Sequence, residues 1–276
     1  MSGSSEQPTP RRWGVYEVLW RSGLLNVITI ARRELGSYFV SAMAWVVGAL
    51  VILPVSLFGY LLPILSQNQA SMDSVFSIIA FLMLFLMPLY TMRLLAEERR
   101  QGTLEMLLTS PLRDWELITG KWLGGFLFFT ATIAFTLVYL VLFLYYLQDR
   151  VSLHLAGQTV TVGNLDWGTI ASGYAGLLLV GATFTAIGVL ASSVTQNQII
   201  AAVVGVVGLM LLWYLGIFSQ FLGAPYDSFF DYVGGSNRYA GFSRGLIQVK
   251  DVAYFLSLII GSLFLATRVI ESRRWR

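Results

Sequence analysis

The sequence predicts an all-α integral membrane protein with six transmembrane helices. Hydrophobic residues make up 56% and charged residues only 12% of its 276 residues, and the mean hydropathy is +0.70. Soluble proteins average about 25% charged residues, so this chain has more apolar surface than a soluble fold can bury. The apolar residues also form six runs that are long enough, or nearly so, to cross a hydrocarbon layer of about 30 Å as a helix.

Polar segments of different lengths separate the predicted spans. The spans extend over residues 42–64, 74–92, 122–147, 167–190, 199–222 and 252–270. They lack the two-residue alternation of barrel strands, and a helix satisfies its own backbone hydrogen bonds in lipid. No Asp, Glu, Lys, Arg or His lies between Asp166 and Asp227, where the polar octet ASSVTQNQ (residues 191–198) indicates a tight turn. A single transmembrane domain over residues 42–270 is therefore expected.

The basic residues predict the orientation. With the N-terminus inside, all but four of the 18 Lys and Arg residues are cytoplasmic, the exceptions being Arg150, Arg238, Arg244 and Lys250. Because Lys and Arg accumulate in cytoplasmic loops, both termini are expected in the cytoplasm, with residues 271–276 as a tail. Residues 1–23 are expected to be a disordered, basic segment without a secretory signal. Anionic lipid headgroups explain the pI near 9.2 better than nucleic acid does.

Residues 24–41 have the pattern of an amphipathic helix in the inner membrane interface. Apolar side chains recur on one face, and basic side chains lie on the opposite face. The candidate residues of this helix are Leu24, Ile28, Arg32, Arg33, Glu34 and Leu35. Two interpretations remain open: a membrane anchor only, or a lateral helix that also braces a cytoplasmic partner.

The segment between the second and third spans, residues 93–121, is the most informative part of the chain. It contains five basic and five acidic side chains. The second span can continue as a helix through Glu97 and Glu98 until Gly102, because glycine in a helix costs about 1 kcal/mol relative to alanine. Thr103 can cap a new short helix whose first turn contains Glu105, near the positive end of the helix dipole.

This short helix is a candidate docking element. Leu104, Leu107 and Leu108 share one of its faces, and exposed apolar side chains in such an arrangement usually mark a protein contact. Packing on the membrane surface is the alternative. Ser110 and Pro111 then predict the start of the next helix, so movement of a partner would be transmitted into the second and third spans.

Two outer segments are also distinctive. Residues 149–166, with the single histidine His154, have the alternation of a short hairpin. Residues 223–250 combine glycines and charges with aromatic side chains suited to the headgroup level, and they predict a re-entrant hairpin in preference to an interfacial loop. The aromatic candidates are Tyr226, Phe229, Phe230, Tyr239 and Phe242.

Small residues and prolines predict helix contacts and kinks. Gly120 and Gly124, and Gly173, Gly181 and Gly188, allow close helix approach within the chain or at a dimer interface, with packing within the chain favoured. Pro54, Pro63 and Pro88 predict kinks or helix ends.

Three stretches of the chain resemble a known family. They are RLLAEERRQGTLEMLLTSPLRDWELITGKWL (residues 93–123), LDWGTIASGYAGLLLVGATFTAIGVLASSVTQNQIIAAVVG (165–205) and GFSRGLIQVKDVAYFLSL (241–258). Together they are similar to the permease subunit of type-two ATP-binding-cassette (ABC) exporters, especially the branch that includes gliding-motility transporters. The stretch ARRELGSYFVSAMAWVV (31–47) also resembles the opening of that branch.

The resemblance implies a complete architecture. It comprises six helices, an amphipathic N-terminal helix, a re-entrant outer hairpin, and a coupling helix at residues 103–109 with Glu97 and Glu98 on the adjoining stalk. It also implies a second permease subunit, identical or paralogous, and two copies of a cytoplasmic ABC ATPase that bind ATP and Mg. The location implied is the bacterial inner membrane.

The residues agree with a permease that has no nucleotide site of its own. A phosphate-binding loop requires G-x-x-x-x-G-K-[ST], but Gly120 and Lys121 are followed by Trp122, and Trp115 stands where the first glycine belongs. The absence of cysteine excludes disulfides and thiolate metal sites, and no cofactor is expected in this chain.

Competing functions fit less well. An ion-coupled transporter usually needs an ionisable residue at mid-membrane, and the spans lack one. A non-transporting anchor that only docks an ATPase remains the alternative to a permease. The substrate is not specified, although the neutral, aromatic-rich spans suit an amphipathic or lipid-linked molecule.

Overall fold

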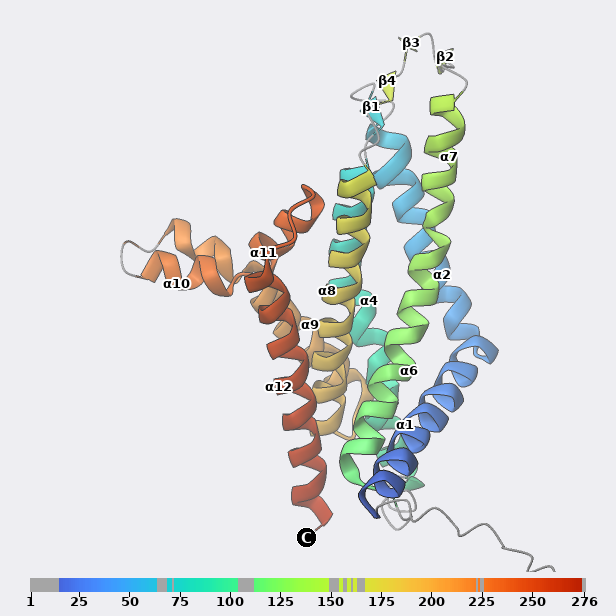
Figure 1. Cartoon of the computed structure of the whole chain (residues 1–276), viewed down its shortest axis with the longest axis vertical. Helices are drawn as coiled ribbons and strands as arrows, with labels where there is room; N and C mark the ends of the chain where they lie inside the picture. The colour runs from blue at the N-terminus through green and yellow to red at the C-terminus, as the bar shows by residue number, and fades with distance from the viewer. Residues whose placement is uncertain are drawn as a thin grey trace, which may run out of the picture.

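Long helices running side by side form the body of the molecule (Figure 1). This computed structural model describes residues 15–63, 69–70, 72–103, 112–148, 154–155, 158–159, 161–162, 167–221, 223 and 226–274. The helices are α1 (Val15–Val40), α2 (Ala42–Pro54), η1 (Val55–Leu61), α4 (Met72–Arg100), α6 (Asp114–Phe135), α7 (Leu137–Gln148), α8 (Trp167–Val194), α9 (Gln198–Tyr214), η2 (Leu215–Gln220), α10 (Tyr226–Val233), α11 (Gly235–Ser243) and α12 (Val249–Arg274).

Among the described residues, four two-residue strands lie at the upper end of the molecule in Figure 1. They are β1 (Gln69–Ala70), β2 (His154–Leu155), β3 (Gln158–Thr159) and β4 (Thr161–Val162). Strands β2 and β3 pair antiparallel, with His154 opposite Thr159, and β1 pairs parallel with β4. An antiparallel pair thus lies within the loop 149–166, where the alternation indicated one.

Five helical stretches among the described residues are long and apolar enough to cross a membrane. They are Met72–Arg100, Asp114–Leu142, Trp167–Val194, Gln198–Gln220 and Val249–Ser272. A sixth candidate is a bent pair, Gly23–Val40 with Trp45–Leu61, whose axes differ by 73°. The prediction of a helical membrane protein is therefore confirmed. The first predicted span corresponds to α2 and η1, which meet the length requirement only together with α1.

Prolines act differently at two positions. Pro54 closes α2, and the chain continues as the π-helix η1, because proline has no N–H to donate and its ring displaces the preceding turn. Pro88, in contrast, lies buried inside the continuous helix α4, where it faces Gly205 of α9.

Helix α8 is the centre of the bundle and packs against α4, α6, α9, α11 and α12. Its glycines make this close packing possible. A Cβ atom added at Gly181 would overlap the ring of Phe129, and one added at Gly188 would overlap Thr91. These contacts confirm that the glycines serve packing within the chain. The polar octet after α8 forms a shorter turn than predicted, since α8 continues to Val194 and Asn197 caps α9 by accepting from the N–H of Ile199 at 2.9 Å.

The N-terminal helix is longer than predicted. It begins at Val15, so part of the segment expected to be disordered is helical. The side that packs on α6 contains Val27 and Ala31, whereas Leu24 and Ile28 are each 55% exposed. Leu24 and Ile28 therefore remain available for the predicted contact with lipid, while α6 covers the neighbouring side of the helix at Gly120 and Gly124.

Candidate functional site

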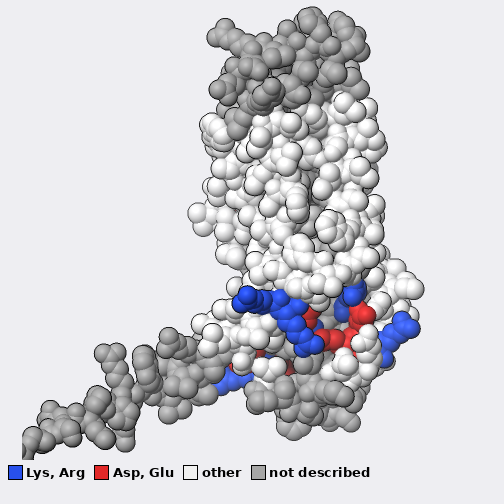
Figure 2. Space-filling view, turned by 90° about the vertical axis from the view of Figure 1, so that its right-hand side faces the viewer, with Lys and Arg blue, Asp and Glu red and all other residues white. Residues whose placement is uncertain are grey.

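The C-terminal end of α4 and the N-terminal end of α6 lie together at one end of the molecule. The lower end of Figure 1 also holds α1 and the C-terminal end of α12. On the face seen in Figure 2, Lys, Arg, Asp and Glu side chains are gathered in a belt near this end, while the bundle above the belt is uncharged. The belt therefore marks the boundary between a lipid-compatible surface and a polar one.

Helix α4 ends as predicted near Gly102. It ends at Arg100, and Gly102 adopts a φ of 70°, a left-handed conformation that glycine accepts without steric cost. The hydroxyl of Thr103 donates to the carbonyl of Glu98 at 3.2 Å. This bond satisfies a free carbonyl at the end of α4, so Thr103 closes the helix that precedes it, a role the sequence did not predict.

The predicted docking helix lies outside the described residues. The same is true of the predicted start of the next helix at Ser110 and Pro111. The docking residues concerned are Leu104, Glu105, Leu107 and Leu108.

Helix α6 begins at Asp114, with Arg113 as the preceding N-cap residue, later than Pro111 suggested. The start is fixed by Glu116, whose carboxylate accepts from the Arg113 N–H at 3.4 Å and from the side-chain amide of Asn26 at 3.0 Å. Glu116 is only 3% exposed, so this bond to α1 is sheltered from water. A carboxylate in the first turn suits the helix dipole, and here it also positions α1.

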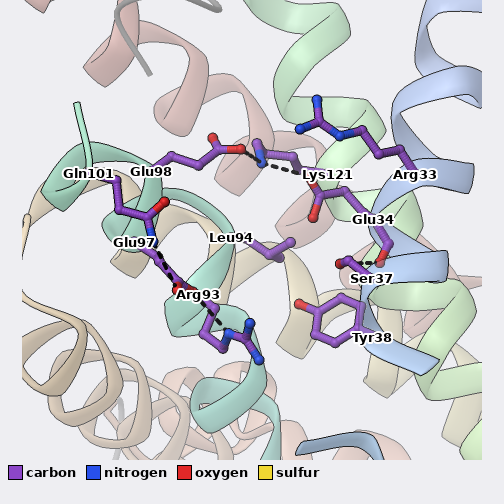
Figure 3. Close-up of a pocket in the computed structure, with 10 residues that line it drawn as sticks. All are labelled: Arg33, Glu34, Ser37, Tyr38, Arg93, Leu94, Glu97, Glu98, Gln101 and Lys121. Carbon is purple, nitrogen blue, oxygen red and sulfur yellow. Dashed lines mark hydrogen bonds and ion pairs between the residues drawn. The ribbon is translucent and has the colours of Figure 1, made fainter. Parts of the chain in front are cut away.

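Lys121 is the centre of the charged belt. Its side chain is 1% exposed, and its ammonium contacts Glu34 of α1 at 2.8 Å and Glu98 of α4 at 2.7 Å (Figure 3). The second oxygen of Glu98 is buried without a hydrogen-bond partner among the described residues. A buried ammonium is tolerated only when it is paired, so Lys121 requires α1, α4 and α6 to stay together. We call Glu34, Glu98 and Lys121 the charge clamp.

A second ion pair lies beside the charge clamp. Arg93 binds Glu97 one turn further along α4 at 2.9 Å and also donates to the hydroxyl of Ser41 at 3.2 Å, and Gln101 donates to Glu97 at 3.3 Å. Glu97 and Glu98 were predicted to belong to the docking surface, but the structure gives both of them partners within the chain. A cavity of about 170 Å³ opens between the two groups, and Figure 3 shows its lining.

Two glycines of α6 hold α1 in place. A Cβ atom at Gly120 would lie 2.8 Å from the Cβ of Ile30, and one at Gly124 would lie 2.7 Å from the Cβ of Glu34. The two helices thus approach closely enough for Glu34 to reach Lys121, one turn away on the α6 surface.

The predicted residues of α1 divide accordingly. Arg32 and Arg33 are exposed, while Glu34 and Leu35 are half-buried. The sequence did not single out Lys121 as a site residue. A signal was present, because Lys121 stands at the edge of a long apolar run, where a charge needs a partner.

The aromatic residues predicted for the re-entrant hairpin also divide into two groups. Tyr226 and Phe229 of α10 are 62% and 61% exposed, and the Phe230 ring lies 6.1 Å from the ring of Phe218 of η2, at a tilted angle of 49°. Tyr239 and Phe242 of α11 are buried. Helix α10 therefore presents an aromatic surface, whereas α11 belongs to the core.

A buried ion pair attaches α11 to α12. Arg238 and Asp251 are each 6% exposed and are 2.6 Å apart, and the Arg238 guanidinium lies 3.9 Å from the centre of the Tyr232 ring. The Tyr254 hydroxyl donates to the Val233 carbonyl at 2.6 Å. These bonds fix the α10–α11 pair against the start of α12.

The fold and the charge belt define a multi-pass helical membrane protein. Among the described residues, no group of three or more His, Cys, Asp or Glu side chains is arranged to hold a metal ion. A family model described as "ABC-2 family transporter protein" matches residues 60–237, and the chain therefore belongs to this family. The ABC-2 membrane domain is a permease component that has no nucleotide-binding domain of its own. A comparison with curated proteins found no match.

Proposed function

We propose that this protein is the transmembrane subunit of an ATP-driven exporter in the bacterial cytoplasmic membrane. Its family membership supports a permease, and the three stretches described above support the branch that includes gliding-motility transporters. The substrate class that suits the spans is amphipathic or lipid-linked, because α4, α8 and α9 have no charged side chain between Val75 and Met92 or between Trp167 and Gln220.

The charge clamp is the observation on which the mechanical part of the proposal rests. A loop whose only task is to connect two helices does not require a fully buried lysine shared by three of them. The clamp makes the ends of α4 and α6, together with α1, a single block next to residues 104–111. A force applied to residues 104–111 would therefore move the linked ends of α4, α6 and α1 together.

The source of the force is proposed to be a separate cytoplasmic ABC ATPase. Two copies would bind ATP and Mg, and each would contact the leucine face of residues 103–109 in one of two permease subunits, identical or paralogous. The unequal distribution of Lys and Arg supports a cytoplasmic location for this end and for both termini.

The outer α10–α11 pair is proposed to be a re-entrant hairpin in the outer leaflet. Phe242 of α11 packs against Gly176, which lies nine residues beyond the start of α8, or about 14 Å along the helix axis at 1.5 Å per residue. Helix α10 projects sideways from the bundle below the upper end of α8 (Figure 1). Its exposed Tyr226 and Phe229 suit contact with lipid.

Replacement of Leu104 by aspartate tests ATPase docking. We expect this variant to reach the membrane and to lose co-purification of the ATPase, because a charge on the apolar face opposes burial in the interface. Ser272→Asp is the control, since Ser272 is exposed near the C-terminal end of α12, and it should retain the ATPase. Retention of the ATPase by Leu104→Asp would show that the docking assignment is wrong.

ATP-dependent substrate movement in reconstituted membranes separates a permease from a membrane anchor. Movement requires the complete complex in a sealed vesicle, and its absence with a bound, active ATPase would favour the anchor.

A further inference from the structure

A side chain of α8 forms hydrogen bonds with the backbone of α4 at the point where the uncharged part of α4 meets its charged end. The Ser192 hydroxyl of α8 accepts from the backbone N–H groups of Leu95 at 3.2 Å and Ala96 at 3.0 Å, and it donates to the Met92 carbonyl at 3.0 Å. Met92 and Ala96 are the two ends of one i to i−4 backbone bond of α4. Ser192 is 0% exposed, so no water competes for these bonds.

A side chain that enters the backbone ladder of a helix creates a local bending point. The hydroxyl lies 3.0 Å from both the Ala96 nitrogen and the Met92 carbonyl oxygen and offers each an alternative partner. A small bend there therefore does not leave either group without a hydrogen bond. Elsewhere in a buried helix, a similar bend would leave a backbone N–H or carbonyl without a partner, which is unfavourable.

The contacts of α4 change on the two sides of this point. Toward the uncharged end, α4 packs against α8 at Gly188 and against α9 at Gly205, so it is held by the core. Toward the charged end, Glu98 binds Lys121 of α6, and Arg99 donates to the Thr195 carbonyl between α8 and α9 at 3.3 Å. Ser192 therefore lies between a part of α4 that packs on the glycines of α8 and α9 and a part that an ion pair joins to α6.

We propose that Ser192 forms the pivot about which the charged end of α4 moves relative to the core. This inference rests on the proposed function, because the movement is the one that an ATPase would produce. Ser192 is a positioning residue: it keeps the bending point at one turn of α4 and keeps its backbone groups hydrogen-bonded as the helix bends.

The neighbouring serine provides a matched control. Ser193 is also buried, at 1% exposure, but its hydroxyl donates to the Leu190 carbonyl of its own helix at 2.7 Å. Ser193→Ala removes a buried hydroxyl without affecting α4, whereas Ser192→Ala removes the same group together with the bonds to α4.

Hydrogen exchange of the whole protein in nanodiscs tests the bonds themselves. In Ser192→Ala, we expect the amides of Leu95 and Ala96 to exchange about five- to tenfold faster, as the loss of one buried hydrogen bond predicts. In Ser193→Ala, they should exchange at the wild-type rate. Equal exchange in the two variants would overturn the proposal.

A distance measurement in the assembled transporter tests the pivot. The chain has no cysteine, so spin labels can be placed at the exposed positions Gln101 of the charged end and Val203 of α9 by cysteine substitution. We expect the distance to shift on ATP binding in the wild-type background and in Ser193→Ala, and the shift to be lost in Ser192→Ala with the ATPase still bound. An undiminished shift in Ser192→Ala would overturn the pivot, whereas no shift in the wild-type background would overturn the proposed function.

Discussion

Replacing Lys121 with methionine should strongly destabilise the protein. The variant removes the ammonium that contacts both Glu34 and Glu98, and it leaves the two carboxylates facing one another across the α1–α4–α6 contact. Methionine keeps most of the buried hydrocarbon of the lysine side chain, so the perturbation is mainly electrostatic. The expected result is loosening of α1 together with the ends of α4 and α6.

The magnitude follows from the burial of the three side chains. Removing one partner from a buried ion pair typically destabilises a protein by about 3–5 kcal/mol. The side chains of Glu34 and Glu98 are 17% and 20% exposed. Water can therefore partly solvate the unpaired carboxylates, and the lower value of about 3 kcal/mol applies. At about 2–4 °C per kcal/mol for a chain of this size, the Tm should fall by about 6–12 °C.

Thermal unfolding in detergent or nanodiscs, followed by tryptophan fluorescence, measures the effect. Arg268→Met is the matched control, because Arg268 and Glu271 form a pair at 59% and 42% exposure, and exposed pairs contribute about 0–1 kcal/mol. The triple variant Lys121→Met, Glu34→Gln, Glu98→Gln should recover much of the loss, since it leaves no unpaired charge. A Tm of Lys121→Met equal to that of Arg268→Met would refute the assignment of the clamp.

Two further predictions concern the packing of α1 on α6 and the ion pair between Arg238 and Asp251. Gly124→Leu should separate α1 from α6 and increase protease cleavage of α1, because a Cβ there would lie 2.7 Å from the Cβ of Glu34; Gly261→Leu, with nothing within 4 Å, should not, and equal cleavage would contradict the contact. Arg238→Met should lower the Tm by about 6–12 °C, since it leaves Asp251 buried and unpaired. Lys250→Met, at an exposed position, should have a Tm within about 2 °C of the wild-type value. Equal Tm values for the two variants would contradict a structural role for the pair of Arg238 and Asp251.

Features set by local chemistry were predictable. The break at Gly102 follows from the conformational freedom of glycine, and the turn before α9 follows from a polar stretch that contains the capping residue Asn197. Both depend on residues close together in the chain. The hydroxyl of Thr103 bonds to the end of α4, a role that the sequence did not predict, while its predicted role as the cap of a following helix concerns residues outside the described part of the chain.

The sequence by itself determined that the chain is a helical membrane protein, how its charges divide between two ends, and which family it resembles, because hydropathy and charge follow from composition and order alone. The tertiary structure decided which face of α1 meets α6, that Lys121 joins Glu34 to Glu98, and that Ser192 reaches the backbone of α4. These contacts join residues between 23 and 100 positions apart, and their geometry depends on helix rotations and separations that no local pattern specifies.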